Sequence, residues 1–113
     1  MSFVKISTKE KTVYLTRLIG KVLKILHLVE EKQHDYKIYL GGLMLEIHSA
    51  NDLFDNQLID ILIKLNSIYI NDFEYKQIRK IILECKNNIN FLLDVMEKDE
   101  EGVIDNESSN SKQ

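Results

Sequence analysis

Apolar residues recur at alternating spacings of three and four along three stretches of this chain. Because an α-helix has about 3.6 residues per turn, this spacing gathers the apolar side chains on one face of a helix. The chain also lacks proline, the residue that interrupts a helix from within. Three amphipathic helices are therefore predicted. Their apolar faces consist of Leu15, Leu18, Val22, Ile25 and Val29; Phe54, Leu58, Ile61, Leu65 and Ile68; and Ile78, Ile82, Cys85, Ile89, Leu92 and Met96.

A fourth stretch, from Tyr36 to Ala50, fits two kinds of secondary structure. A helix would align Tyr36, Leu40, Leu43 and Ile47. A β-hairpin turning at Gly41-Gly42 would instead alternate apolar and polar residues across its two strands. We favour the helix, because an isolated hairpin is marginally stable in water and two glycines in a helix let a neighbouring helix approach closely.

The connections predicted near residues 32–35, 48–52 and 69–72 are short, which favours antiparallel neighbours. At 113 residues and 44% hydrophobic composition, the chain is long enough for one core. We therefore expect an all-α fold, an antiparallel four-helix bundle over residues 1–97. The alternative is a β-hairpin over residues 36–47 packed on three helices.

Polar residues near the expected helix starts suggest caps for the free backbone N–H groups. Thr8 or Thr12 could cap the first helix, and Asn51 or Asp52 the third. Asn71 with Glu74, three residues later, resembles a capping box for the fourth helix.

Charge is distributed unevenly along the chain. Residues 1–33 contain seven Lys or Arg against three Asp or Glu, a net charge of +4, whereas residues 92–113 contain two against seven, a net charge of −5. Few residues after Met96 are apolar, so this end cannot bury enough surface to order itself. We expect a disordered acidic tail over residues 98–113.

The residues needed for catalysis do not assemble into a recognisable motif. The chain has no Gly-rich phosphate loop, and its only cysteine, Cys85, falls on the apolar face of the last helix, where a thiol is inert. His27, Glu30 and His34 have the spacing of a metal site, but metal sites in bundles draw ligands from several helices. We expect no enzymatic activity, no metal and no cofactor.

The longest purely apolar runs, such as Ile61–Ile63, are far shorter than the roughly 20 residues that span a bilayer. The first residues also lack the pattern of a secretory signal. These observations predict a cytoplasmic protein that does not insert into membranes.

The first helix carries the candidate binding surface, which consists of Tyr14, Arg17, Lys21, Lys24 and Leu28. Its basic residues lie opposite the core stripe and could contact an anionic partner. Only two of the fifteen basic residues are Arg, which weakens the case for nucleic acid. The apolar arc of this helix is also wide. Either it is the central helix of the bundle, or it contacts a partner such as a second copy of the chain.

The stretch from Tyr14 to Val22 and from Leu26 to Glu31, followed by Tyr39 to Ile47, resembles a group of small uncharacterised proteins from low-GC Gram-positive bacteria. Some of these proteins are labelled as related to capsule biosynthesis. The resemblance covers about the first half of the chain and includes no catalytic motif. The size and helix count are also similar to those of bacteriocin immunity proteins, an analogy of fold alone.

These observations favour a non-enzymatic protein-binding module: an adaptor, accessory subunit or inhibitor of a bacterial or mobile-element system. Its partner would be an unknown protein or a second copy, as in a homodimer. One alternative is a nucleic-acid-binding accessory protein that uses the basic face of the first helix. Another is a four-helix protein like the bacteriocin immunity proteins.

Overall fold

The computed structural model describes residues 6–112, with side chains as far as Lys98. These residues form α-helices and one short 3-10 helix, without any strand. The elements are α1 (Thr8–Glu30), α2 (Tyr36–Ala50), η1 (Asn51–Phe54), α3 (Ile59–Ile70) and α4 (Tyr75–Lys112). The all-α prediction is confirmed, and the stretch that could have been a hairpin is the helix α2.

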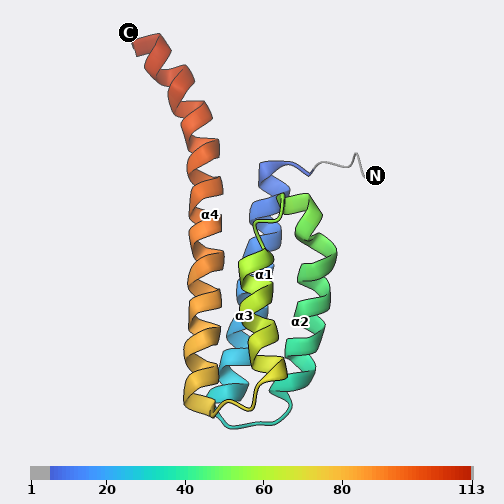
Figure 1. The fold of residues 1–113 in the computed structure, drawn as a ribbon. Coiled ribbons are helices and arrows are strands. Elements are labelled where there is room, and N and C mark those ends of the chain that lie inside the picture. The colour runs from blue at the N-terminus through green and yellow to red at the C-terminus, as the bar shows by residue number, and fades with distance from the viewer. Residues whose placement is uncertain (1–5, 113) are drawn as a thin grey trace.

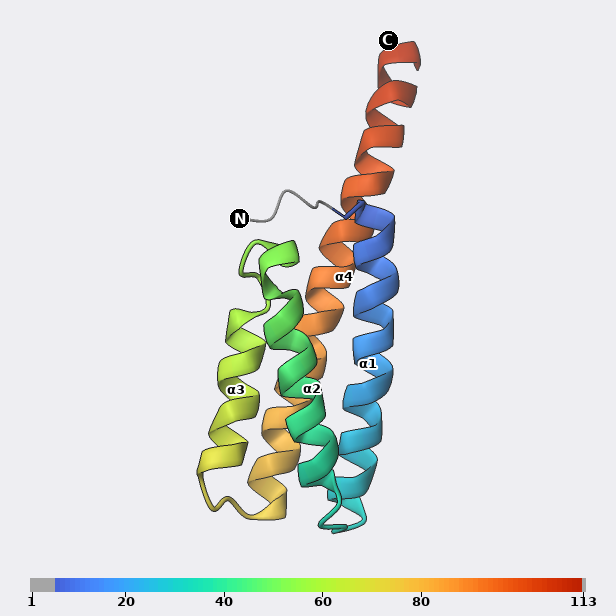
Figure 2. The same ribbon diagram turned by 90° about the vertical axis from the view of Figure 1, so that its right-hand side faces the viewer.

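Successive helices run in opposite directions, up and down the bundle (Figures 1 and 2). α1 packs most extensively against α4 and also contacts α2, whereas α3 contacts α2 and α4. Each helix therefore has two neighbours around a common core, which is the arrangement of an antiparallel four-helix bundle.

The core consists of the apolar faces predicted from the helical spacing. Leu18, Leu40, Leu65 and Ile82, one from each α-helix, are fully buried. Burying a side chain of this size contributes about 1.5–3 kcal/mol, so the four stripes together hold the bundle closed. Leu92 departs from the prediction, because it is only partly buried against the edge of the core.

The cap of α1 is Ser7, which precedes both of the threonines proposed for it. The Ser7 hydroxyl accepts a hydrogen bond from the backbone N–H of Glu10 at 3.1 Å, and the Glu10 carboxylate accepts from the Ser7 N–H at 3.3 Å. Thr12 instead donates its hydroxyl to the carbonyl of Lys9 within the helix. The assignment to Thr8 or Thr12 was wrong because the capping box requires Glu at the third helical position.

We expect Ser7→Ala to lower the free energy of unfolding by about 1 kcal/mol, because it leaves the Glu10 N–H without its cap. Thr8→Ala is the matched control and should change the stability by much less. Urea unfolding of the two variants measures the difference. Equal losses in both would contradict the assignment of the cap to Ser7.

The connection between α2 and α3 is longer than predicted, so α3 begins at Ile59 rather than near Asp52. It contains η1 and two non-glycine residues in the left-handed region, Asp55 at φ 51° and Asn56 at φ 65°. The buried Asn51 side chain spans this turn. Its Oδ1 accepts from the Leu58 N–H at 3.2 Å, and its Nδ2 donates to Oδ1 of Asn56 at 2.8 Å.

Asn51→Ala would leave the buried Leu58 N–H without an acceptor. We expect it to lower the free energy of unfolding by about 1–3 kcal/mol. Asn56→Gly is the control, since it loses only the bond to Asn51 at an exposed position and glycine tolerates a positive φ. Chemical denaturation should show a clearly larger loss for Asn51→Ala. A larger loss for Asn56→Gly would mean that backbone conformation, not the Leu58 N–H, determines the stability of the turn.

The capping box proposed for α4 at Asn71 and Glu74 was wrong as well. Asn71 belongs to the end of α3, where its Nδ2 donates to the carbonyl of Ser67 at 2.8 Å. At the start of α4 the Glu74 N–H donates to Oε1 of Gln77 at 3.3 Å. The side chain that accepts from the backbone N–H at the start of α4 is therefore that of Gln77, three residues after the expected Glu74.

The acidic tail predicted over residues 98–113 falls almost entirely on residues whose side chains lie outside the described part of the structure. The backbone of α4 is helical as far as Lys112, and Gln113 is not described. Disorder of this tail stays a prediction.

Candidate interaction surfaces

Tyr14, the first member of the surface predicted on α1, is partly buried against the core. Its ring lies 5.4 Å from that of Phe54, and its hydroxyl donates to the carbonyl of Glu46 at 3.4 Å. Burial, with a further contribution from the Glu46 carboxylate, raises the pKa of Tyr14 to about 12. Tyr14 therefore joins α1 to α2 and η1.

Two of the three basic residues predicted for this surface contact α2. Lys21 forms an ion pair with Glu46, and the Lys24 ammonium lies 4.7 Å above the centre of the Tyr39 ring. Arg17 is exposed, whereas Leu28 is partly buried against the core. The structure thus divides the five predicted residues between internal contacts and the solvent.

The width of the apolar arc on α1 has an explanation within the chain. α4 covers one side of this helix and α2 the other, so more of its circumference is buried than a helix with a single neighbour would need. Of the two explanations considered, the contacts favour a central helix. The buried residues of α1 are Leu15, Leu18, Val22, Ile25, Leu26 and Val29.

The histidine-rich end of α1 makes contacts of another kind. Glu30 accepts a hydrogen bond from Nε of Arg79 at 2.9 Å, and Nδ1 of His34 lies 3.4 Å from the Tyr75 hydroxyl. In the described part of the chain, no group of three or more His, Cys, Asp or Glu side chains is placed to hold a metal ion. His27, Glu30 and His34 do not converge.

Cys85 is fully buried in the core, as its position on the apolar stripe predicted. Its sulfur lies 4.0 Å from the carbonyl oxygen of Ile61. Burial raises the pKa of the thiol from 9.0 to about 12, so the reactive thiolate is scarce at neutral pH.

We expect the Cys85 thiol to resist alkylation in the folded protein and to react once urea unfolds it. Because the pKa is raised in the folded state, this group stabilises the fold fully below pH 9.0, and its contribution is lost as the pH rises toward 12. The stability of Cys85→Ala should therefore fall less steeply above pH 9.0 than that of the wild type. Alkylation followed by mass spectrometry tests the first expectation. Fast labelling under native conditions would contradict it.

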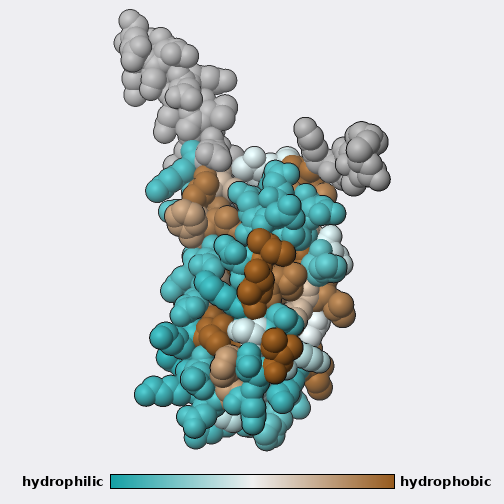
Figure 3. Space-filling model, viewed as in Figure 1, coloured by the Kyte–Doolittle hydropathy of each residue, from teal (hydrophilic) through white to brown (hydrophobic). Residues whose placement is uncertain are grey.

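A second surface, which was not predicted from the sequence, lies on α2 and α3. Large apolar side chains on these helices face the solvent: Ile38 is 73% exposed, Leu45 72%, Ile63 60%, Tyr69 57% and Ile70 70%. Apolar side chains are visible over α3 in the space-filling view (Figure 3). We call these five residues, with the groove between the two helices, the α2–α3 face.

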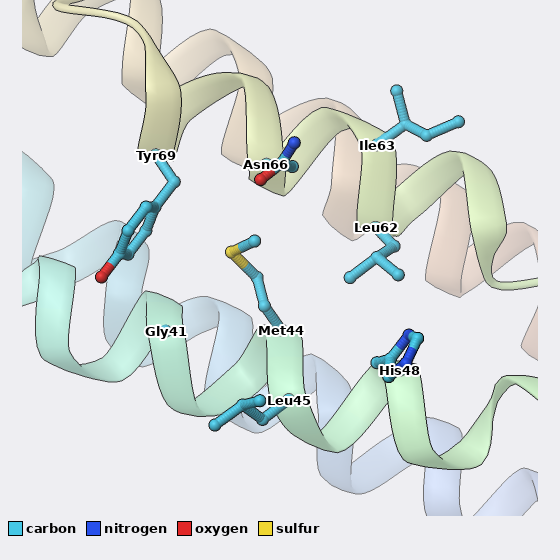
Figure 4. A pocket seen from close by; sticks show the side chains of 8 residues that line it. All are labelled: Gly41, Met44, Leu45, His48, Leu62, Ile63, Asn66 and Tyr69. Carbon is cyan, nitrogen blue, oxygen red and sulfur yellow. The ribbon is translucent and has the colours of Figure 1, made fainter.

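The groove has a volume of about 580 Å³ and is open to the solvent. Met44 extends from α2 toward α3, Leu62 and Tyr69 extend from α3 toward α2, and Ile63 points away from the groove (Figure 4). Gly41 lies at one end, where an added Cβ would lie 3.7 Å from Cε2 of Tyr69. The lining contains no Asp, Glu, Lys or Arg. It consists of Gly41, Met44, Leu45, His48, Leu62, Ile63, Asn66 and Tyr69.

The sequence did contain a signal for this surface. Within α3 the residues Ile59, Ile63 and Ile70 lie outside the stripe formed by Ile61, Leu65 and Ile68, so the helix is apolar on more than one side. Such a helix is expected to be covered all round. Here α3 has only α2 and α4 as major neighbours.

Within the described residues, the helices are too short or too polar to cross a membrane. No protein-family model, curated protein or solved structure matches the chain. A proposal of function must therefore come from the chemistry of the surfaces themselves.

Proposed function

We propose that this chain is a non-enzymatic protein-binding module whose contact surface is the α2–α3 face. The observation that supports the proposal is the set of five large apolar side chains, each more than half exposed, on two adjacent helices. Contiguous apolar surface of this kind typically marks an interaction site, and covering it releases about 25 cal/mol per Å².

The shape of the face favours a protein over a small molecule. Ile38 and Ile70 do not line the groove, and the Ile63 side chain points away from it, so a ligand confined to the groove would leave much of their surface in water. The lining residues of α2, at positions 41, 44, 45 and 48, follow the spacing that meets a helix laid along the groove. A partner that presents an apolar helical surface would cover the groove together with the exposed side chains beside it.

The biological role within this proposal is that of an adaptor, accessory subunit or inhibitor. The resemblance to small proteins of Gram-positive bacteria would place it in a bacterial or mobile-element system, and a cytoplasmic location belongs to the same proposal. An inhibitor role would also fit the analogy with bacteriocin immunity proteins, although no residue-level feature favours it.

Nucleic-acid binding through α1 has less support. Lys21 and Lys24 already contact Glu46 and Tyr39, so phosphate groups would have to compete with these partners. Exposed pairs of this kind are worth less than about 1 kcal/mol, so phosphate groups could displace these partners. No feature of α1, however, favours the binding of nucleic acid.

The proposal is tested with charge substitutions on the α2–α3 face. Leu45→Glu and Ile63→Glu change exposed positions, so both variants should keep the helical circular dichroism of the wild type. We expect each to lose proteins that tagged wild-type chain retains from a lysate of its native cells. Phe91→Glu is the matched control, since Phe91 is 67% exposed but lies on α4. Retention of the same proteins by all four chains would refute the role of this face.

A further inference from the structure

We propose that the partner of the α2–α3 face is a second copy of this chain, in a dimer with two-fold symmetry. This inference depends on the proposed function, because it names the partner of the same surface. It is supported by the charges on the four helices, the spacing of the exposed residues and the size of the face.

The outermost positions along α2 and α3, about one per turn of each helix, carry no charged residue. They are Ile38, Gly42, Leu45 and Ser49 on α2, and Ile59, Ile63, Asn66 and Ile70 on α3. In a two-fold dimer the same patch meets its own copy, so a charged patch would repel itself. An uncharged apolar patch is complementary to itself without any compensating partner.

The other two helices lack this property. The outward side of α1 carries Arg17, Lys21 and Lys24, and that of α4 carries Lys76 and Lys80. Contact between two copies through either helix would bring like charges together, at a cost in free energy. Of the outward stripes on the four helices, those of α2 and α3 are the ones without a charged residue in the part of the chain that the structure describes.

The charged residues of α2 and α3 lie beside the face or at its ends. Glu46 is directed toward α1 through its ion pair with Lys21, and Lys64 is only partly exposed. Lys37 and Asp60 are exposed, and each lies in the first turn of its helix, so these two charges would lie near the ends of the interface.

The spacing of the exposed stripe on α3 suits an antiparallel pair. Ile59, Ile63, Asn66 and Ile70 follow one another at intervals of four, three and four, a sequence of intervals that is the same in both directions. When α3 packs antiparallel to α3 of the second copy, Ile59 lies opposite Ile70, and Ile63 lies opposite Asn66. Each Asn66 then faces an isoleucine of the other copy. In a shifted register, an isoleucine would remain exposed to water.

The size of the face predicts a weak dimer. α2 has 15 residues and α3 has 12, so each helix is about 20 Å long and the two together are about 20 Å wide. The resulting flat area of about 400 Å² is well below the roughly 800 Å² per partner that standard specific interfaces bury. We therefore expect dissociation in the micromolar range.

Sedimentation equilibrium of the full chain, at concentrations from about 1 to about 200 μM, tests the dimer. We expect the wild type and Phe91→Glu to dimerise alike. Ile63→Glu should raise the dissociation constant at least about 10-fold, because it introduces a charge into the centre of the interface, while its circular dichroism stays that of the wild type. A wild type that remains monomeric throughout, or an Ile63→Glu variant that dimerises as well as the wild type, would overturn the inference.

Disulfide trapping tests the antiparallel arrangement, and the buried Cys85 should not interfere. Under mild oxidation, a mixture of Ile59→Cys and Ile70→Cys chains should form a cross-linked heterodimer. Ile59→Cys alone should not, because its two copies would be about 16 Å apart along the helix axis, beyond the reach of a disulfide. Equal cross-linking by Ile59→Cys alone would overturn the arrangement.

Failure of the dimer can be distinguished from failure of the proposed function. If the wild type is monomeric but retains a protein that Ile63→Glu loses, the face binds a different protein, and only the identity of the partner is wrong. If the monomer retains nothing that depends on Ile63, both proposals fail.

Discussion

The contact between α1 and α4 is the one on which the rest of the bundle depends. These two helices have the most extensive packing of any pair, although they come from opposite ends of the folded chain. Their apolar stripes leave each helix with a second side free to contact the shorter α2 or α3. Because the long helices pack on each other, the short ones need only to cover the rest of the core.

This arrangement of two long and two short helices explains where apolar surface remains exposed. α1 is covered on two sides, and its basic residues partly pair with α2 through Glu46 and Tyr39. α3 has fewer polar positions but no more neighbours, so Ile63 and Ile70 remain in water. The exposed apolar surface therefore lies on α2 and α3, and not on α1, whose wide apolar arc is covered by α2 and α4.

Much of the fold was predictable from the sequence, because burial and helical spacing are linked directly. Leu15, Leu65 and Ile82 are buried where the stripes placed them. The helix boundaries were less predictable. Phe54 and Leu58 keep the helical spacing although η1 and a turn contain them, because a 3-10 helix and a tight turn can place two residues four apart on the same side. Several Ser, Thr and Asn residues near each start could also act as caps, and only the geometry selects Ser7.

The candidate site was harder to predict than the fold. The five residues proposed on α1 were chosen from the properties of one helix, and whether such a residue is exposed depends on its neighbours. Lys24 lies over Tyr39 because α2 is adjacent, and this contact cannot be inferred from the sequence of α1 alone. The exposed side of α3 could have been suspected from Ile59, Ile63 and Ile70, yet its exposure follows only from knowing that no fifth helix covers it within the described residues.

The Asn51 turn has a consequence for the order in which the chain folds. It joins α2 and α3 through contacts between residues close in sequence, whereas the packing of α1 on α4 must close a loop of more than forty residues. Local contacts form sooner, since they lose less chain entropy on closure. The α2–α3 hairpin can then form before α1 pairs with α4. During synthesis α1 is available to cover α2 from the start, whereas the side of α3 that packs on α4 stays uncovered until α4 emerges and docks.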